Sequence, residues 1–372
     1  MIIERKMQGK IEQSLFNGKV IVLYGARQVG KTTLLRAIEK KYPLDSVYFN
    51  CDEPDIRLAF SNTTSTAIKS FIGNKKLILL DEAQRVENIG LTLKLLVDNF
   101  PKTQVIATGS SSFDLSNKIV EPLTGRKYEF YLYPFSLEEL EQQYSKLELR
   151  RLLDQRMIFG MYPEVVENAD EVENTVKNLA RSYSYKDVLQ YDGIRNPEVL
   201  EKLLQAVALQ IGNEVSYNEL GRLVGINRIT VNNYLNILEK AFIIFRLRPL
   251  SRNPRKELAR HHKIYFYDTG IRNALINNFN PLSLRADTGV LWENFWIAER
   301  IKNNSNYERD VKMYFWRTYS QQEIDFVEEK GESLSGFECK WNDDKKYKAP
   351  SNWQDSYPAA SFDIATPNKL FE

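Results

Sequence analysis

Two hydrophobic patterns alternate along the first 145 residues of the chain. Short apolar, β-branched runs predict buried strands, and the stretches between them carry apolar residues at helical spacing. The predicted strands are Lys19–Tyr24, Val47–Asn50, Lys76–Leu80, Gln104–Thr108 and Tyr128–Tyr133. Strands separated by helices predict an α/β domain with a parallel sheet and helices on both faces. Such a sheet binds ligands at the carboxyl ends of its strands.

The pattern becomes helical after the last of these strands. A charged stretch from Ser136 to Tyr191, broken at Gly160–Pro163, predicts a helical connector or lid. The next segment has an amphipathic helix at Val199–Ile211, a second helix opened by the capping-box match Ser216–Glu219, a third helix from Asn227 and a returning strand. This order predicts a winged helix-turn-helix, which reads DNA in many proteins and serves as a docking or lid element in others.

The C-terminal third returns to strands. Apolar runs predict strands at Lys263–Tyr267, Lys312–Arg317, Gln322–Glu328 and Leu334–Trp341, and Val290–Lys302 has the spacing of a strongly amphipathic helix. A second α/β domain is therefore expected here.

The turn after the first predicted strand carries the most informative motif. Gly25–Thr32 matches G-x-x-x-x-G-K-[ST], with a strand before it and a helix after it. The two glycines let the backbone approach phosphates, Lys31 would reach the β- and γ-phosphates, and the Thr32 hydroxyl would hold Mg²⁺. The predicted nucleotide-binding residues are Gly25, Ala26, Arg27, Gln28, Val29, Gly30, Lys31, Thr32 and Thr33.

Two further strand ends complete the expected nucleotide site. The run LILLDEAQ places Asp81 and Glu82 after four apolar residues, which is the Walker B pattern. Asp81 would position Mg²⁺, and Glu82 would activate the attacking water. The next strand ends in ATGS and is expected between the P-loop and Walker B strands. We nominate Ser110 as the polar residue that contacts the γ-phosphate or the water, with Thr108 as the second choice.

Arg126 precedes the fifth strand of this domain. A guanidinium in that place could stabilise transition-state charge, either in cis or on a neighbouring subunit. The alternative is an ordinary surface arginine.

A second set of charged residues lies in the C-terminal third. Period-two alternation puts Glu338 and Lys340 on one face of a strand. A helix Glu293, a strand Asp325 and this E-x-K pair have the order of a PD-(D/E)xK site. Glu293, Asp325 and Glu338 would hold Mg²⁺ or Mn²⁺, and Lys340 would act on the attacking water. The alternative is a restriction-endonuclease-like fold whose polar residues serve structure only.

One basic run stands out in a nearly neutral chain. Arg246–Lys263 holds seven Arg or Lys and one Glu, and its prolines predict a wing or loop. It could contact a phosphate backbone or be a solvated linker. The third helix of this segment is only weakly basic, so its contact with DNA stays open.

Composition excludes several other classes of protein. The 372 residues carry a net charge of +2 and are 43% hydrophobic, which fits a globular protein of more than one domain. The longest apolar runs fall far short of the about 20 residues that span a bilayer, and Met1–Lys10 lacks the apolar core of a signal peptide. Two cysteines exclude a disulfide scaffold, and two histidines disfavour histidine-based catalysis. We therefore expect a cytoplasmic protein.

The motifs together resemble one family. The chain resembles bacterial and archaeal AAA-type ATP-binding proteins that carry a winged-helix segment and a C-terminal domain of unknown function related to PD-(D/E)xK nucleases. The resemblance covers nearly the whole chain and rests on YGARQVGKTTLL, LLDEAQ, ATGSSS, LTGRKYEFYLYPFSLEEL, RITVNNYLNILEKAFIIF, KIYFYDTGIRNAL, WENFWIAE, EIDFVEE and FECKW. It implies ATP as the nucleotide.

The expected organisation has four parts: a P-loop ATPase core (1–145), a helical connector or lid (146–195), a winged helix (196–258) and a PD-(D/E)xK nuclease-like domain (259–372). The favoured function is Mg²⁺-dependent ATP hydrolysis coupled to DNA binding or processing, with DNA preferred over RNA. The alternative is a nucleotide-switched scaffold with protein partners and an inactive nuclease-like domain. A small-molecule kinase is disfavoured because Glu82 fits a water-activating hydrolase. Assembly into a homo-oligomer is compatible with either function.

Overall fold

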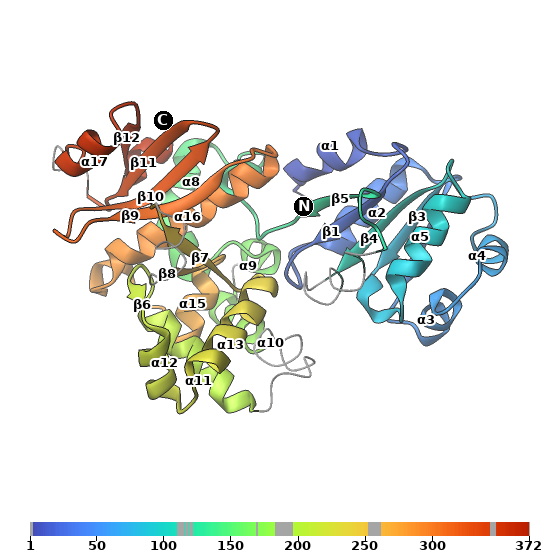
Figure 1. Cartoon of the computed structure of the whole chain (residues 1–372), viewed down its shortest axis with the longest axis horizontal. Helices are drawn as coiled ribbons and strands as arrows, with labels where there is room; N and C mark the ends of the chain where they lie inside the picture. The colour runs from blue at the N-terminus through green and yellow to red at the C-terminus, as the bar shows by residue number, and fades with distance from the viewer. Residues whose placement is uncertain are drawn as a thin grey trace. The chain divides into compact units, whose positions relative to one another are not determined.

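The chain folds into two compact units in the computed structural model. The structure describes residues 3–109, 115, 119, 122–168, 170–182, 196–251, 262–342 and 347–371. One unit consists of Ile2–Tyr133 with Lys240–Phe242, and the other of Pro134–Glu239 with Ile243–Glu372. Each unit has its own sheet (Figure 1). Among the described residues, no helix is long and apolar enough to cross a membrane.

The N-terminal unit is built on a parallel five-stranded sheet, which confirms the predicted α/β class. Its strand order is β2-β3-β4-β1-β5, and every neighbouring pair is parallel. The strands are β1 (Val20–Tyr24), β2 (Ser46–Asn50), β3 (Leu77–Asp81), β4 (Gln104–Gly109) and β5 (Lys127–Tyr131). Strands β1, β3 and β4 are buried along their whole length, which explains their continuous apolar runs.

Short helices surround this sheet. They are α1 (Lys6–Gln13), α2 (Lys31–Lys41), α3 (Pro54–Phe60), α4 (Ser65–Ile72), the 3₁₀ turn η1 (Ala83–Arg85) and α5 (Ile89–Asn99). Helix α2 packs on β2 and β3, and α5 packs on β4. The buried face of α2, which includes Leu34, Leu35 and Ile38, therefore holds the helix start against the carboxyl edge of the sheet.

The second unit contains a mixed seven-stranded sheet with the order β12-β11-β10-β9-β7-β8-β6. Its strands are β6 (Glu214–Val215), β7 (Ile244–Pro249), β8 (His262–Phe266), β9 (Lys312–Arg317), β10 (Glu323–Lys330), β11 (Ser333–Cys339) and β12 (Ser361–Ala365). The pairs β7–β9 and β11–β12 are parallel, and the other neighbours are antiparallel.

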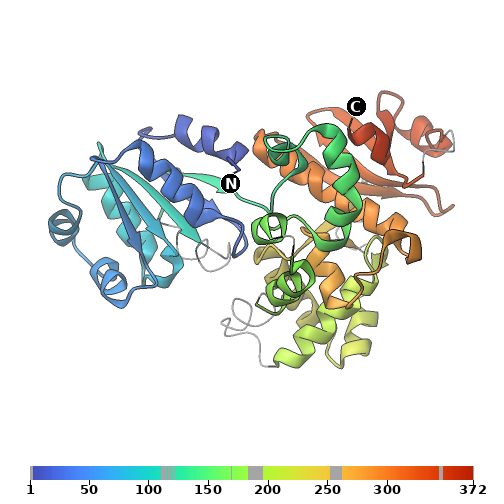
Figure 2. The same cartoon turned by 180° about the vertical axis from the view of Figure 1, so that it is seen from behind.

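The helices of the second unit include those that the sequence predicts in the connector, in the winged-helix segment and over Val290–Lys302, and also short helices near the C-terminus that it does not predict (Figure 2). They are α7 (Leu137–Leu140), α8 (Lys146–Phe159), α9 (Pro163–Glu167), α10 (Val172–Ser182), α11 (Pro197–Leu209), α12 (Tyr217–Val224), α13 (Arg228–Lys240), α15 (Thr269–Leu275), η3 (Leu282–Leu284), α16 (Thr288–Asn306), α17 (Ser351–Ser356) and α18 (Pro367–Leu370). The side chains of Ser216 and Asn227 cap the starts of α12 and α13, as their positions in the sequence suggest.

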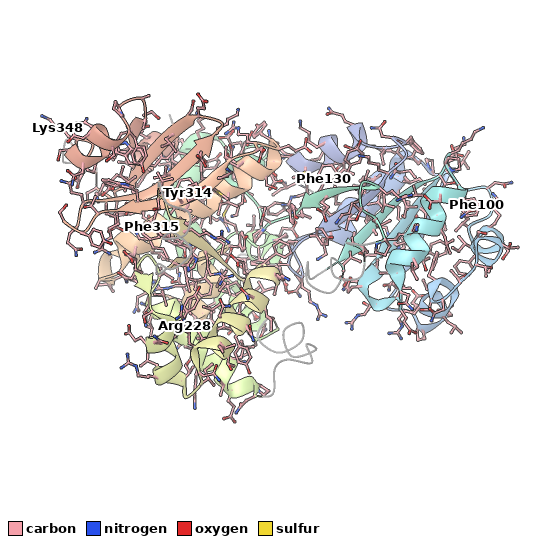
Figure 3. The ribbon with its side chains drawn as sticks, viewed as in Figure 1. Phe100, Phe130, Arg228, Tyr314, Phe315 and Lys348 are labelled. Atoms are coloured by element: carbon pink, nitrogen blue, oxygen red, sulfur yellow. The ribbon has the colours of Figure 1, made fainter. Side chains whose placement is uncertain are left out.

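One strand joins the two halves of the large sheet. Strand β7 pairs with β8 on one side and with β9 on the other, where Arg248 lies opposite Tyr314 and Pro249 opposite Phe315. Tyr314 and Phe315 are marked on β9 in Figure 3. The expected boundary at residue 258 therefore falls between two hydrogen-bonded strands of a single sheet.

The predicted break at Gly160–Pro163 has a specific packing reason. Helix α8 ends at Phe159, and Gly160 adopts φ +86° against the side chain of Asp268. Asp268 caps α15 and also accepts a hydrogen bond of 2.7 Å from the Met161 backbone N–H. A side chain at Gly160 would overlap this carboxylate, so the break fixes α8 against α15.

Candidate functional site

The phosphate-loop motif adopts the strand–loop–helix form that the sequence predicts. Gly30 has φ +96° and precedes α2, so a side chain there would be strained. Gly25 is required for another reason: a Cβ atom would lie 2.2 Å from the backbone oxygen of Leu132. The first glycine thus allows the loop to pass close to the chain beyond β5, and the second allows the turn into the helix.

Lys31 is folded into this loop. Its Nζ donates hydrogen bonds of 2.7 Å to the backbone oxygens of Gly25 and Ala26, and the side chain is buried. Thr32 and Thr33 are exposed at the start of α2. The helix start therefore combines a positive end of the helix dipole, an ammonium group and two accessible hydroxyls, which suits a polyphosphate anion.

Arg5 supports the loop from behind and was not predicted. Its Nη1 donates to the Val29 backbone oxygen at 2.6 Å, and its Nη2 donates to the Tyr133 backbone oxygen at 2.6 Å. The guanidinium is buried and links the phosphate loop to the end of the sheet. A single arginine near the start of the chain gives no sequence pattern from which this role could be predicted.

Asp81 is surrounded by hydroxyl groups. Thr32 Oγ1 donates to Asp81 Oδ2 at 2.5 Å, Tyr48 donates to the same oxygen at 2.8 Å, and Thr108 donates to Oδ1. The carboxylate is buried, and Arg36 stacks on the Tyr48 ring at 3.3 Å from its centroid. The two residues expected to hold Mg²⁺ in this unit, Thr32 and Asp81, are therefore in direct contact, and a threonine hydroxyl beside a carboxylate suits that ion.

Glu82 has an unusual backbone. It adopts φ 53° and ψ 41°, a left-handed conformation that non-glycine residues seldom take. Its backbone N–H donates to Thr108 Oγ1 at 3.1 Å, and its carboxylate accepts a hydrogen bond of 2.5 Å from Gln84 Nε2. Strain of this kind persists where the surroundings enforce it and is common at functional sites.

Strand order brings Thr108 to this site. Strand β4 lies between β1 and β3, which confirms the predicted position of the ATGS strand. Thr108, the second choice from the sequence, contacts both Asp81 and the backbone of Glu82. Ser110, the first choice, lies outside the described residues.

Arg126 lies at the other end of the sheet. Its backbone oxygen accepts a hydrogen bond from Val20 N–H at the start of β1, whereas Gly25 follows the end of β1. The strand between them spans roughly 13 Å. The guanidinium pairs with Asp98 at 3.0 Å and is partly exposed. The geometry thus contradicts a role in cis, and action on a neighbouring subunit stays a prediction.

The second unit gathers acidic residues around a buried lysine. Lys263 Nζ lies 3.3 Å from Glu293 Oε1 and 3.7 Å from Asp325 Oδ1, and it also pairs with Glu323. Tyr265 donates to Glu293 Oε1 at 2.5 Å. Burial raises the pKa of Glu293 to about 7, and the charge of Asp325 acts in the same direction. Burial alone would lower the pKa of Lys263, but these carboxylates outweigh it and raise that pKa.

The predicted E-x-K pair forms a separate contact. Lys340 Nζ lies 2.7 Å from Glu338 Oε1, while Glu338 Oε2 is buried without a hydrogen-bond partner. Burial raises the pKa of Glu338, and the charge of Asp325 adds to the shift. Asp325 Oδ2 accepts a hydrogen bond of 2.8 Å from the backbone N–H of Cys339.

The predicted metal set of the second unit does not form a ligand cluster. Within the described ranges, no group of three or more His, Cys, Asp or Glu side chains is placed to hold a metal ion. Glu293 and Asp325 face the ammonium of Lys263 instead, and Glu338 faces Lys340. Lys263 ends the basic run in the sequence, which gives no sign that its side chain is buried among carboxylates.

The basic run is also less exposed than the sequence suggests. Arg246 donates to Glu239 Oε2, Asn236 Oδ1 and Asn232 Oδ1 on α13, and Lys263 is buried. Arg248 is exposed. Residues 252–261 lie outside the described ranges. At the two ends of the run, β7 and β8 form a hydrogen-bonded antiparallel pair, as expected from the returning strand and from the strand predicted at Lys263–Tyr267. The wing itself stays a prediction.

Comparison with protein families matches three segments of the chain. Residues 17–141 match the model of an AAA domain, residues 150–282 a domain of unknown function (DUF8612), and residues 288–367 a second domain of unknown function (DUF4143). The chain therefore contains a P-loop domain of the AAA type. The segments after it are similar to domains whose function is not described.

Several curated relatives match over most of the chain. The chain is 29% identical to an uncharacterized protein of Methanocaldococcus jannaschii, over 82% of this chain and 74% of that protein. It is 27% identical to an uncharacterized protein of Mycobacterium tuberculosis, over 91% of this chain and 74% of that protein.

Solved structures give weaker likenesses. The RuvB Holliday junction branch migration motor of Thermotoga maritima is 17% identical, with a TM-score of 0.31 over 69% of this chain and 95% of that chain. The Pif1 helicase of Candida albicans gives a TM-score of 0.27 over 49% of this chain and 48% of that chain.

Proposed function

We propose that this protein binds Mg²⁺·ATP and hydrolyses it. The observation that carries the proposal is the contact of Thr32, Asp81 and Thr108 beside the loop of Lys31, in a segment that matches an AAA domain. These groups come from α2, β3 and β4 and meet at the carboxyl edge of a parallel sheet, where such sheets bind their ligands.

Each group has a distinct task in this proposal. The loop N–H groups and Lys31 bind the phosphates, and Thr32 with Asp81 holds Mg²⁺, which neutralises phosphate charge when bound. Glu82 orients the attacking water and accepts its proton. Thr108 fixes the Asp81 carboxylate and the backbone of Glu82, so the two acids keep a constant relative position.

The test compares phosphate release and nucleotide binding in matched variants of the full chain. Lys31→Ala should lose ATP binding or hydrolysis, whereas Lys40→Ala, an exposed lysine on the same helix, should behave as wild type. Full activity of Lys31→Ala would refute the nucleotide site. Phosphate transfer to an acceptor without release of free phosphate would indicate a kinase.

A second candidate function is DNA binding by the second unit. The element order α11-β6-α12-α13-β7-β8, with β8 between β7 and β6 in the sheet, matches the order expected of a winged helix and supports this candidate. Arg228 lies at the start of α13, the helix that would read DNA (Figure 3). A polar hollow of about 290 Å³ lies beside this helix, lined by Asn232, Asn236, Glu239, Arg246, Arg248 and His262.

The DNA-binding candidate predicts affinity that falls with salt, because phosphate contacts release counterions. Titration of labelled duplex and single-stranded DNA at several salt concentrations, with and without ATP, measures this. If no binding occurs while ATP hydrolysis is intact, the nucleotide-switched scaffold with protein partners is the better account.

A further inference from the structure

The acidic cluster of the second unit contains its own cation. The ammonium of Lys263, on β8, faces Glu293 on α16 and both Glu323 and Asp325 on β10. Only 2% of this side chain is exposed. A charge so deeply buried is stable only when it is paired, so the position of Lys263 depends on these carboxylates.

Other contacts fit the same ammonium. The Nζ of Lys263 lies 5.6 Å from the centroid of the Phe315 ring, within the range of a cation–π contact. Tyr265 donates its hydroxyl proton to Glu293 Oε1, the oxygen that also faces Lys263. The ammonium of Lys263 is therefore contacted by the Phe315 ring and by a Glu293 carboxylate whose position Tyr265 fixes. The cation at the centre of this site is a monovalent side chain of the protein itself.

A divalent metal needs carboxylate oxygens about 2.0–2.6 Å from one point. Two oxygens that would bind such a metal, Glu293 Oε1 and Asp325 Oδ1, already lie 3.3 Å and 3.7 Å from the Nζ of Lys263. A metal bound there would meet an ammonium at close range without solvent screening. Asp325 has its other oxygen engaged by the Cys339 backbone, and Lys340 holds one oxygen of Glu338.

We propose that Lys263 takes the place of a divalent metal among Glu293, Glu323 and Asp325, so that the nuclease-like site of this chain is a metal-independent ion-pair cluster. The cluster ties α16 and β10 to β8. It follows that the wild-type protein binds no Mg²⁺ or Mn²⁺ at Asp325, and that removal of the ammonium creates such a site. The inference does not depend on ATP hydrolysis, because it concerns the other unit.

The experiment measures Mn²⁺ binding to the full chain by electron paramagnetic resonance, with metal alone and no nucleotide. Wild type and Asp325→Asn should bind equally, because the asparagine keeps an acceptor for Cys339 and no metal is lost. Lys263→Met should gain one site that binds at least tenfold tighter than any in wild type. Lys263→Met/Asp325→Asn should lose that site again. Mn²⁺ bound elsewhere cancels in these comparisons.

Lys330→Met serves as the control, since it removes an exposed lysine from β10, the strand that carries Asp325, and should gain no site. Wild-type binding of Mn²⁺ that disappears in Asp325→Asn would overturn the proposal, as would metal-dependent DNA cleavage that disappears in that variant. A folded Lys263→Met that gains no site would also overturn it. Should Lys263→Met fail to fold, the comparison of wild type with Asp325→Asn still decides.

Discussion

The hydroxyl of Thr32 lies 2.5 Å from Asp81 Oδ2, although 49 residues separate them in the chain. The contact exists because α2 begins beyond β1, and only β4 separates β1 from β3 in the sheet. Thr108 on β4 fills the gap between them and donates to the other oxygen of Asp81. The sheet order therefore determines which side chains surround the proposed Mg²⁺ site.

Glu82→Gln should bind ATP and hydrolyse it at least about 100-fold more slowly. A glutamine keeps the size of the side chain but cannot accept the proton of the attacking water, and general-base contributions are typically of this order. Single-turnover phosphate release and nucleotide affinity, measured on the same preparation, separate the two effects. Glu87→Gln, an exposed residue five positions on, is the control. Normal turnover of Glu82→Gln would remove Glu82 from this role.

Thr108→Val should reduce hydrolysis more than it reduces ATP affinity. The valine has the same shape but leaves one oxygen of Asp81 and the Glu82 N–H without their partner. The loss of a buried hydrogen bond also costs about 1–3 kcal/mol of stability. Thr92→Val controls for that cost, because the buried Thr92 hydroxyl bonds to the Phe60 backbone away from the site. Equal turnover of the two variants would contradict the positioning role of Thr108.

Local sequence patterns predict the first unit well. Continuous apolar runs identify β1, β3 and β4 because these strands are buried on both faces, and the glycine and lysine positions of the loop are dictated by local geometry. The residues missed are those whose role arises only from long-range packing. Tyr48 reaches Asp81 across neighbouring strands, and Arg5 supports Val29 from the segment that precedes α1.

Lys263 in the second unit is another residue whose role depends on long-range packing and could not be predicted from local sequence. In the sequence it ends a basic run and looks exposed, but pairing of β7 with β8 turns it into the interior among carboxylates 30 to 62 residues away. Alternation along one strand places Glu338 beside Lys340, as the structure confirms. The same alternation does not predict which cation faces Asp325, because that cation, Lys263, lies on β8 and not on the strand of Glu338.

Arg126→Ala should lower ATP hydrolysis only under conditions in which subunits associate. The residue lies at the opposite end of β5 from the phosphate loop, so any contact with ATP must be made on a neighbour. An equimolar mixture of Arg126→Ala and Lys31→Ala should regain activity, because each subunit supplies what the other lacks. Lys102→Ala, an exposed lysine, is the control. A rate equal to wild type at every protein concentration would leave Arg126 as a surface residue.

Arg248→Glu should weaken DNA binding and flatten its dependence on salt. Arg248 is exposed next to α13, whereas Arg246 is held by Glu239 and cannot reach a phosphate without breaking that pair. One lost phosphate contact lowers the salt slope by about 1. Lys312→Glu makes the same charge change on β9 and should have a smaller effect. Unchanged affinity in Arg248→Glu would favour a partner other than nucleic acid.

The ion pairs of Asp287 with Arg272 and Arg285 are expected to make the stability of the second unit depend on pH in the acid range. Its carboxylate accepts hydrogen bonds of 2.8 and 2.9 Å from Arg285 and one of 2.5 Å from Arg272. Partial burial alone would raise its pKa, but these bonds lower it to about 2 from the usual 3.8. A carboxylate whose pKa is lower in the folded state stabilises the fold above its unfolded pKa. That stabilisation is lost as pH falls from about 4 through 2.

Asp287→Asn should therefore be less stable than wild type by about 1–2 kcal/mol at pH 6, after allowance for partial solvent exposure. The difference should shrink below pH 4 and be mostly lost by pH 2, where about half of the folded wild-type molecules carry a protonated Asp287. Urea unfolding followed by tryptophan fluorescence reports this unit alone, because all five tryptophans lie in it. Asp310→Asn, an exposed residue, should show no such trend. A stability difference that stays constant from pH 6 to pH 2 would show that Asp287 acts by packing and not by its charge.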